Sequence, residues 1–203
     1  QTVGILANKE AIAREMLGRV TLMLEHLPFF LQPGCKALNK KSIEFSNNSR
    51  IVAAATSSSS VRGMSLNLVY LDEFAFVDNA AEFYTSTYPV ISSGKTSKII
   101  ITSTANGIGN MYHKLYEGAV QGTNEFTPTR VDWWDVPGRD DKWKAMTIEN
   151  TSQLQFDQEF GNSFHGTGNT LISADILLAL RATNPAEYMN NIKIWDQPEE
   201  GHN

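Results

Sequence analysis

The stretch from Leu66 to Val77, LNLVYLDEFAFV, decides the fold of this chain. Its apolar run has the length of a strand and stops at two adjacent carboxylates, Asp72 and Glu73. Apolar runs of this length are typical of strands buried on both faces of a parallel sheet, and open α/β sheets bind ligands at the carboxyl edge of their strands. The stretch therefore predicts an α/β fold with a polar site where this strand ends.

Two adjacent carboxylates at such an edge suit nucleotide chemistry. The first, Asp72, can hold the coordination shell of Mg²⁺, and the second, Glu73, can orient or deprotonate an attacking water. A second interpretation is that the pair only caps the segment that follows, because acidic residues are common at strand-to-helix junctions. On this stretch alone both interpretations stay open.

A second apolar strand is predicted from Lys98 to Thr104, KIIITST, and it too ends in polar side chains. The chain opens on a third strand, Thr2 to Ala7, and Asn8 is predicted to cap the helix that follows. Helical patterns between these strands favour right-handed crossovers, which join parallel strands. We therefore expect strands near Thr2, Leu68 and Ile99 to be mutually parallel, with helices on both faces of the sheet.

Shorter patterns predict the remaining elements. Two strand-like segments flank the turn residues Asn47-Asn48, which indicates a hairpin at the edge of the sheet. Besides the three parallel strands, the predicted elements are strands 42–45, 50–55 and 126–132, and helices 8–27, 79–91, 110–120, 142–150, 151–160 and 174–182.

Composition narrows the class of protein. A chain of 203 residues with 41% hydrophobic content fits one α/β domain with a small appendage. The net charge of −5 argues against a domain wrapped in nucleic acid, so any contact with DNA is expected to be local. With one cysteine, Cys35, and four scattered histidines, we expect neither an internal disulfide nor a structural zinc. We also expect a soluble, intracellular protein, since no apolar run reaches the roughly 18 residues of a membrane span.

Two further segments could contact phosphate groups. A run of hydroxyl residues from Thr56 to Ser60 leads into Val61-Arg62-Gly63, which is typical of a loop, although an arginine there could reach a phosphate. Gly94-Lys95-Thr96 has phosphate-loop residue types but lies between a helix and a strand. A phosphate loop runs from strand into helix, so we interpret this tripeptide as a surface turn.

Four blocks of the sequence, in this order, resemble the ATPase domain of the large terminase subunit, the DNA-packaging motor of tailed bacteriophages, and most closely the large myophage type. SSSSVRGMS resembles the arginine-glycine loop of that family, and LVYLDEFAF resembles its Walker B strand. PVISSGKTSKIIITSTANG resembles the strand that leads into the coupling motif. LQFDQEFGNSFHGTGNTLIS resembles the end of the ATPase domain, before an RNase H-like nuclease domain. The resemblance covers nearly the whole chain.

The resemblance implies a P-loop NTPase-like fold of the ASCE/RecA type, a mainly parallel sheet flanked by helices, and a site for ATP and Mg²⁺. Asp72 would hold the metal and Glu73 would be the catalytic carboxylate. The cofactor-binding coupling motif would consist of Thr102, Ser103 and Thr104. Arg62 would be a candidate arginine finger, acting on the ATP of its own subunit or of a neighbour in a ring.

One part of the family pattern is absent from the sequence, namely the Gly-Lys-Thr phosphate loop (Walker A) upstream of the Walker B strand. We therefore expect a fragment that lacks the phosphate-loop strand and helix. Residues 1–160 would form the ATPase core from Walker B to the coupling motif, and residues 161–203 would be a connector and helix leading towards an absent nuclease domain. The fragment alone is expected not to hydrolyse ATP.

The complete protein would couple ATP hydrolysis to the translocation of double-stranded DNA into a capsid. The resemblance implies a homo-oligomeric ring, with a portal ring and a small terminase subunit as partners and no membrane. Its place would be the cytoplasm of the infected bacterial host and, transiently, the portal vertex of the procapsid. Two alternatives remain, a superfamily 2 helicase-like ATPase core and a non-catalytic truncated ATPase fold used for protein contacts.

Overall fold

The computed structural model describes residues 1–57, 64–92, 94, 96–164, 187–189 and 192–194. The chain divides into two compact units, Gln1–Thr167 and Gly168–Asn203. In the second unit, β7 (Glu187–Met189) and β8 (Ile192–Ile194) form an antiparallel pair. The predicted helix 174–182 lies outside the described residues.

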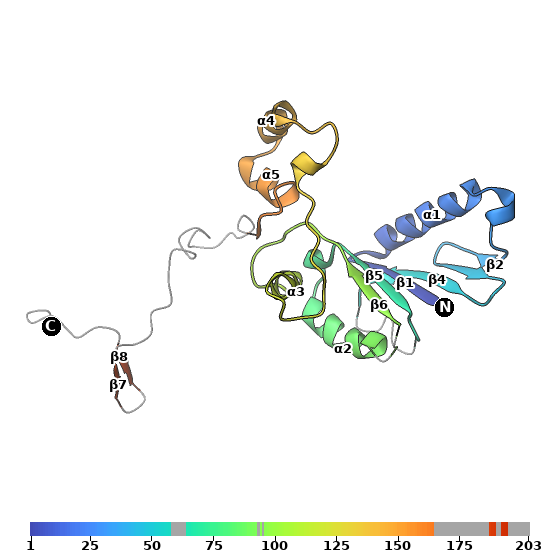
Figure 1. Cartoon of the computed structure of the whole chain (residues 1–203), viewed down its shortest axis with the longest axis horizontal. Coiled ribbons are helices and arrows are strands. Elements are labelled where there is room, and N and C mark those ends of the chain that lie inside the picture. The colour runs from blue at the N-terminus through green and yellow to red at the C-terminus, as the bar shows by residue number, and fades with distance from the viewer. Residues whose placement is uncertain (58–63, 93, 95, 165–186, 190–191, 195–203) are drawn as a thin grey trace, which may run out of the picture. The chain divides into compact units, whose positions relative to one another are not determined.

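A six-stranded sheet organises the first unit, with the strand order β2-β3-β4-β1-β5-β6 (Figure 1). Its strands are β1 (Thr2–Ala7), β2 (Cys35–Leu38), β3 (Ser42–Phe45), β4 (Arg50–Ala55), β5 (Leu68–Asp72) and β6 (Lys98–Ile101). Neighbours among β4, β1, β5 and β6 pair in parallel, whereas β2 and β3 form an antiparallel extension at one edge. The predicted parallel strands are confirmed, as is the hairpin of β3 and β4, whose Asn48 has a φ of 64°. The hairpin does not lie at the edge as expected, because β4 pairs with β1 and the edge strand is β2.

Helices cover both faces of this sheet, as predicted (Figure 1). α1 (Glu10–His26) packs on β1 and β4. α2 (Ala80–Ser92) and α3 (Met111–Val120) lie on the opposite face. Successive side chains of β1 point to opposite faces of the sheet. Ile5 packs in the core under α1, and Leu6 packs in the core under α2 and α3.

The stretch that contains β5 anchors the core beneath α2 and α3. β5 lies between β1 and β6, and its Val69 and Leu71 are no more than 2% exposed. The next element, the short 3₁₀ helix η2 (Phe74–Phe76), buries Phe74 completely. The Phe74 ring meets Phe83 of α2 edge-on, with 6.3 Å between the ring centroids. Burying each of these side chains stabilises the fold by about 1.5–3 kcal/mol, so this stretch holds the sheet and helices together.

Two boundary expectations are wrong. α1 begins at Glu10 with Lys9 as its N-cap, so Asn8 does not cap the helix. The Asn8 Oδ1 atom is instead buried without a hydrogen-bond partner among the described residues. The strand expected to reach Thr104 ends at Ile101, because the ladder between β5 and β6 ends there.

The strand predicted at residues 126–132 is also wrong, since these residues pair with no strand of the described chain. β6 is the edge strand of the sheet, and residues 126–131 line a cavity beside it without joining its ladder. A strand needs the backbone groups of a partner in addition to a suitable sequence. The strand-like sequence is therefore present here without the pairing.

The predicted helices near residues 142–150 and 151–160 are confirmed as α4 (Asp141–Asn150) and α5 (Gln153–Glu159). An aromatic cluster joins them to the short helix η3 (Trp133–Asp135) that precedes them. The centroids of Trp133 and Trp143 lie 6.3 Å apart, and Trp143 meets Phe160 edge-on at 5.2 Å. This cluster gives the α4–α5 pair a small core of its own.

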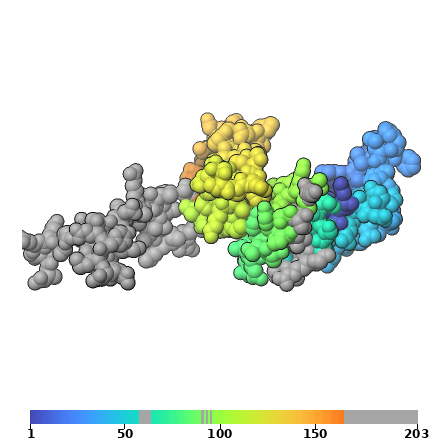
Figure 2. Space-filling model, turned by 60° about the horizontal axis from the view of Figure 1, so that its bottom comes forward, coloured from blue at the N-terminus to red at the C-terminus, as the bar shows by residue number. Residues whose placement is uncertain are grey.

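The turn after α1 is apolar and lies at the surface, within the light-blue part of the space-filling view (Figure 2). It contains the short helix η1 (Phe29–Leu31), in which Phe29 is 90% and Phe30 83% exposed.

Within the part of the chain that the structure describes, no helix is long and apolar enough to span a bilayer.

Packing of α1 on the sheet can be tested with two residues of that helix. Leu17 is buried against the sheet, whereas Leu22 is 54% exposed. Leu17→Ala should lower the free energy of unfolding by about 2–5 kcal/mol, because it removes buried methyl groups and leaves a cavity. The matched control Leu22→Ala should change it by less than about 0.5 kcal/mol. Urea denaturation measures both, and equal losses would contradict the orientation of α1.

Candidate functional site

The backbone turns sharply where β5 ends. Glu73 adopts the left-handed conformation, with φ 50° and ψ 43°, which costs a non-glycine residue on the order of 1 kcal/mol. Glu73 is the N-cap residue of η2, yet its side chain makes no capping hydrogen bond. The Glu73 side chain therefore does not cap η2. The chain thus leaves β5 through a strained residue, Glu73, before it enters η2.

The pairing of β5 with β6 brings Asp72 beside Thr102. Leu71 is in register with Ile101, so Asp72, the last residue of β5, lies beside Thr102, the first residue after β6. The Thr102 hydroxyl donates to Asp72 Oδ1 at 3.0 Å, and the Tyr70 hydroxyl donates to the same oxygen at 3.2 Å. Tyr70 and Thr102 also touch each other, with 2.8 Å between their hydroxyl oxygens. The predicted metal carboxylate is thus held by two hydroxyl groups.

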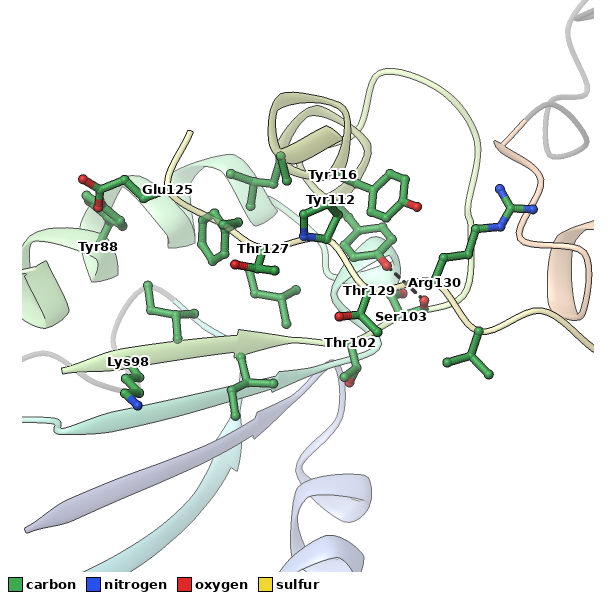
Figure 3. A pocket seen from close by; sticks show the side chains of 18 of the residues that line it. Tyr88, Lys98, Thr102, Ser103, Tyr112, Tyr116, Glu125, Thr127, Thr129 and Arg130 are labelled. Atoms are coloured by element: carbon green, nitrogen blue, oxygen red, sulfur yellow. Dashed lines mark hydrogen bonds between the residues drawn. The ribbon is translucent and has the colours of Figure 1, made fainter. Parts of the chain in front are cut away.

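Backbone and side-chain bonds tie the turn at Glu73 to the segment after β6. The Phe74 N–H donates to the Thr102 carbonyl oxygen at 3.3 Å, and the Ala75 N–H donates to Ser103 Oγ at 3.1 Å. On the other side, the Tyr112 hydroxyl of α3 donates to the Ser103 carbonyl oxygen at 3.2 Å (Figure 3). A shift of either segment would therefore displace the other.

The environment of Glu73 raises the pKa of its carboxyl above the ordinary value. Burial is the largest cause, followed by the negative charges of Asp72 and Glu159. The Thr104 backbone N–H and the Ser103 hydroxyl oppose this change by hydrogen bonding to the carboxylate. A carboxylate with a raised pKa is a better proton acceptor, which suits a general base.

Burial also raises the pKa of the Tyr70 hydroxyl, and the nearby Asp72 carboxylate adds to the effect. The hydroxyl therefore stays protonated at neutral pH and remains a hydrogen-bond donor to Asp72.

The structure brings together five of the six predicted site residues, namely Asp72, Glu73, Thr102, Ser103 and Thr104. The sixth, Arg62, lies outside the described residues. The roles of all six stay predictions. Gly94 and Thr96 lie at the amino end of β6, the opposite edge of the sheet from Asp72, and Lys95 is outside the described residues.

Sequence reasoning missed three residues of this site, Tyr70, Tyr112 and Glu159. Tyr70 had a detectable signal, because residues two apart on a strand share a face and it precedes Asp72 by two. Tyr112 and Glu159 belong to helices α3 and α5, and only tertiary packing brings them to the strand ends.

The oxygen donors at this edge fit Mg²⁺. Asp72 and Glu73 supply carboxylates, and Thr102 adds a hydroxyl. Among the residues that the structure describes, no group of three or more His, Cys, Asp and Glu side chains gathers to hold a metal. Mg²⁺ is usually held by one or two carboxylates together with water and substrate phosphates, so a pair is sufficient.

A cavity of about 1150 Å³ adjoins this site along the open edge of β6 (Figure 3). The apolar side chains of Ile99 and Ile101 form one wall. The segment from Glu125 to Val131 forms another, and α3 contributes Tyr112 and Leu115. The cavity reaches Thr102 and Ser103, so it opens onto the polar site at the end of β6.

Comparison with known proteins gave one family match. A model of the terminase large subunit, T4likevirus-type, N-terminal part, matches residues 1–178.

Solved structures of low sequence identity share the fold. The Thermus phage P74-26 large terminase ATPase domain has a TM-score of 0.62 at 22% identity, covering 81% of this chain and 76% of that one. The large terminase of a thermophilic bacteriophage, in complex with ADP, has a TM-score of 0.62 at 13% identity, covering 81% and 40%. The HK97 bacteriophage large terminase has a TM-score of 0.58 at 17% identity, covering 81% and 38%.

The raised pKa of Glu73 predicts how Glu73→Gln changes stability with pH. A raised pKa means that the folded state favours the protonated carboxyl, so its stabilising effect is complete in acid and is lost as the pH rises through the folded-state pKa. Glutamine resembles the protonated form. At pH 7 to 8, Glu73→Gln should therefore raise the melting temperature, by about 1–3 °C after allowing for solvent screening of a half-buried group.

Calorimetry at several pH values measures this shift. The gain should vanish below about pH 4, where the native carboxyl is protonated as well. Glu82→Gln, at an exposed position of α2, is the control and should show no such pattern. A Glu73→Gln variant that is less stable at neutral pH than in acid, relative to the parent chain, would contradict the electrostatics described for this site.

Proposed function

The chain belongs to the terminase large subunits of the T4likevirus type, whose N-terminal part it matches, and from this premise we propose that it is part of an ATPase motor domain. In the complete protein, ATP hydrolysis at the edge formed by β5 and β6 would drive double-stranded DNA into a capsid. The observation that carries this proposal is the direct hydrogen bond between Asp72 and Thr102, which joins the predicted metal carboxylate to the predicted coupling motif.

Each residue at this edge has a role in the proposal. Glu73, with its raised pKa, would orient the attacking water and accept its proton. Asp72 would hold Mg²⁺, which would neutralise charge on the phosphate oxygens. Thr102 and Ser103 bond to the Asp72 side chain and to the backbone after Glu73, so a change at the nucleotide would move the segment after β6. The proposal assigns Thr104 to the same coupling motif and Arg62 to an arginine finger.

We further propose that a phosphate-binding strand and loop, from outside the present chain, complete the site beside β6. The Lys98 and Thr102 N–H groups donate to Asn67 and Leu71 of the β5 segment, so alternation along the ladder turns the backbone groups of Ile99 and Ile101 away from β5. The cavity on that side is lined by these residues and by residues 125–131, whose strand-like sequence has no partner among the described strands. A parallel strand placed there would end at the same edge as Asp72.

The remaining parts of the proposal concern the complete protein. We propose a homo-oligomeric ring that acts with double-stranded DNA, a portal ring and a small terminase subunit. It would work in the cytoplasm of the infected host and at the portal vertex of the procapsid. The net charge of −5 supports a local DNA contact in this part of the protein, because broad contact with phosphates requires clustered positive charge.

The paired carboxylates can be tested by two substitutions in the complete protein. Glu73→Gln should leave ATP binding nearly intact and lower turnover by about 100-fold or more, the scale of losing a general base. Asp72→Asn should instead weaken Mg²⁺-dependent nucleotide binding. Nucleotide titration beside steady-state hydrolysis measures both variants. Small and equal effects of the two substitutions would show that the pair is not catalytic. A complete protein that unwinds DNA without packaging it would favour the helicase alternative.

The chain as it stands should bind Mg-ATP weakly. Without a lysine and a cradle of backbone N–H groups for the phosphates, two carboxylates face a nucleotide of the same charge. Calorimetric titration should show no saturable heat up to about 1 mM nucleotide. The same titration of a longer polypeptide that includes the phosphate loop should saturate. A single-site isotherm in the low micromolar range for the short chain would contradict the proposal that its phosphate site is incomplete.

A further inference from the structure

The Tyr70 hydroxyl takes part in a three-cornered contact that no function proposed so far uses. Its partners are Asp72 Oδ1, at 3.2 Å, and Thr102 Oγ1, at 2.8 Å, and those two oxygens lie 3.0 Å apart. Tyr70 and Asp72 belong to β5, and Thr102 directly follows β6, which pairs with β5 in a fixed register. The sheet therefore sets the positions of the three side chains.

Three contacts share only two hydroxyl protons. If Asp72 is ionised, it donates none, so the protons of Tyr70 and Thr102 can satisfy only two of the three contacts at one time. Either both hydroxyls donate to Asp72, or one hydroxyl donates to the other, which then donates to Asp72. The same three side chains thus have several hydrogen-bonding arrangements that differ by rotation of a hydroxyl group.

Thr102 also has an acceptor outside this contact, since its Oγ1 lies 3.5 Å from the Leu71 carbonyl oxygen. It follows the edge strand β6, whereas Tyr70 is in the interior strand β5. The Tyr70 ring packs against the core cluster under α1, which contains Ile5 and Leu17. The Tyr70 hydroxyl is therefore fixed in place, and the Thr102 hydroxyl is the one that can exchange partners.

We propose that Tyr70 is a positioning residue for Asp72, and that it keeps a donor on this carboxylate when Thr102 turns to another acceptor. The inference rests on the proposed function, in which Asp72 holds Mg²⁺ and Thr102 belongs to the coupling motif. Thr102 can then respond to the nucleotide without leaving Asp72 unpaired. An unpaired, partly buried carboxylate would otherwise penalise the moved state of Thr102.

The contact can be tested in the chain itself by carbon-13 NMR of tyrosine labelled at Cζ, the ring carbon that bears the hydroxyl. The chain has six tyrosines, and the signal that is lost in Tyr70→Phe identifies Tyr70. Thr102→Val and Asp72→Asn should each shift this signal, because each changes the hydrogen bonding of the hydroxyl. The signal of Tyr84, which packs against the other core cluster under α2 and α3, is the control and should stay in place. An unchanged Tyr70 signal in both variants overturns the proposal.

The role is tested in the complete protein by measuring hydrolysis at saturating ATP over a range of Mg²⁺ concentrations. Tyr70→Phe keeps the ring and removes only the hydroxyl. It should raise the half-saturating Mg²⁺ concentration about tenfold, the scale expected for a residue that orients a metal ligand. Tyr84→Phe should change it less than about twofold. A purely packing role for Tyr70 predicts no change in either variant, which overturns the proposal.

The two measurements separate this inference from the proposed function. If the parent protein shows no Mg²⁺-dependent hydrolysis, the proposed function fails, and the NMR experiment still decides whether Tyr70 holds Asp72. If the parent protein is active but Tyr70→Phe has the same Mg²⁺ dependence, the proposed function stands and the role of Tyr70 is rejected.

Discussion

The parallel pairing of β5 with β6 is the constraint on which the rest of the site depends. Because Leu71 and Ile101 are in register, Asp72 at the end of β5 and Thr102 just after β6 are neighbours, and Thr102 reaches the carboxylate by a direct hydrogen bond. A slip of one residue would turn each side chain of β6 to the other face of the sheet. The apolar layers on the two faces make such a slip costly, so core packing sets the geometry of the polar edge.

Glu73 combines a strained backbone with a partly buried carboxylate. Its left-handed backbone and partly buried carboxylate are both unfavourable, and both are held by the residues on either side. Before it, Leu71 is in the core, and after it Phe74 is fully buried while the Ala75 N–H is bonded to Ser103. Strained residues that are held in place by the well-packed structure around them are typical of functional sites.

A cavity lies between the edge strand β6 and residues 126–131, so the strand-like sequence of residues 126–131 has no partner among the described strands. One side of the cavity is lined by residues 126–131, and another side is lined by Ile99 and Ile101 of β6. The two segments do not pair as strands across it. An unpaired edge of isoleucines is a liability for a sheet unless another element covers it. This is the physical basis for proposing that a further strand lies between them in the complete protein.

The sequence by itself predicted most of the local elements and the parallel orientation of the strands near Thr2, Leu68 and Ile99, because apolar periodicity, strand length and turn residues are properties of neighbouring positions. It also identified Asp72, Glu73 and the Thr102–Thr104 motif, which stand at the ends of such strands. Only the tertiary structure decided that Glu73 is left-handed, that Tyr70 bonds to Asp72 and Thr102, and that Glu159 raises the pKa of Glu73. These depend on distances between segments far apart in the chain, and residues 126–132 show that a strand pattern forms no strand without a partner.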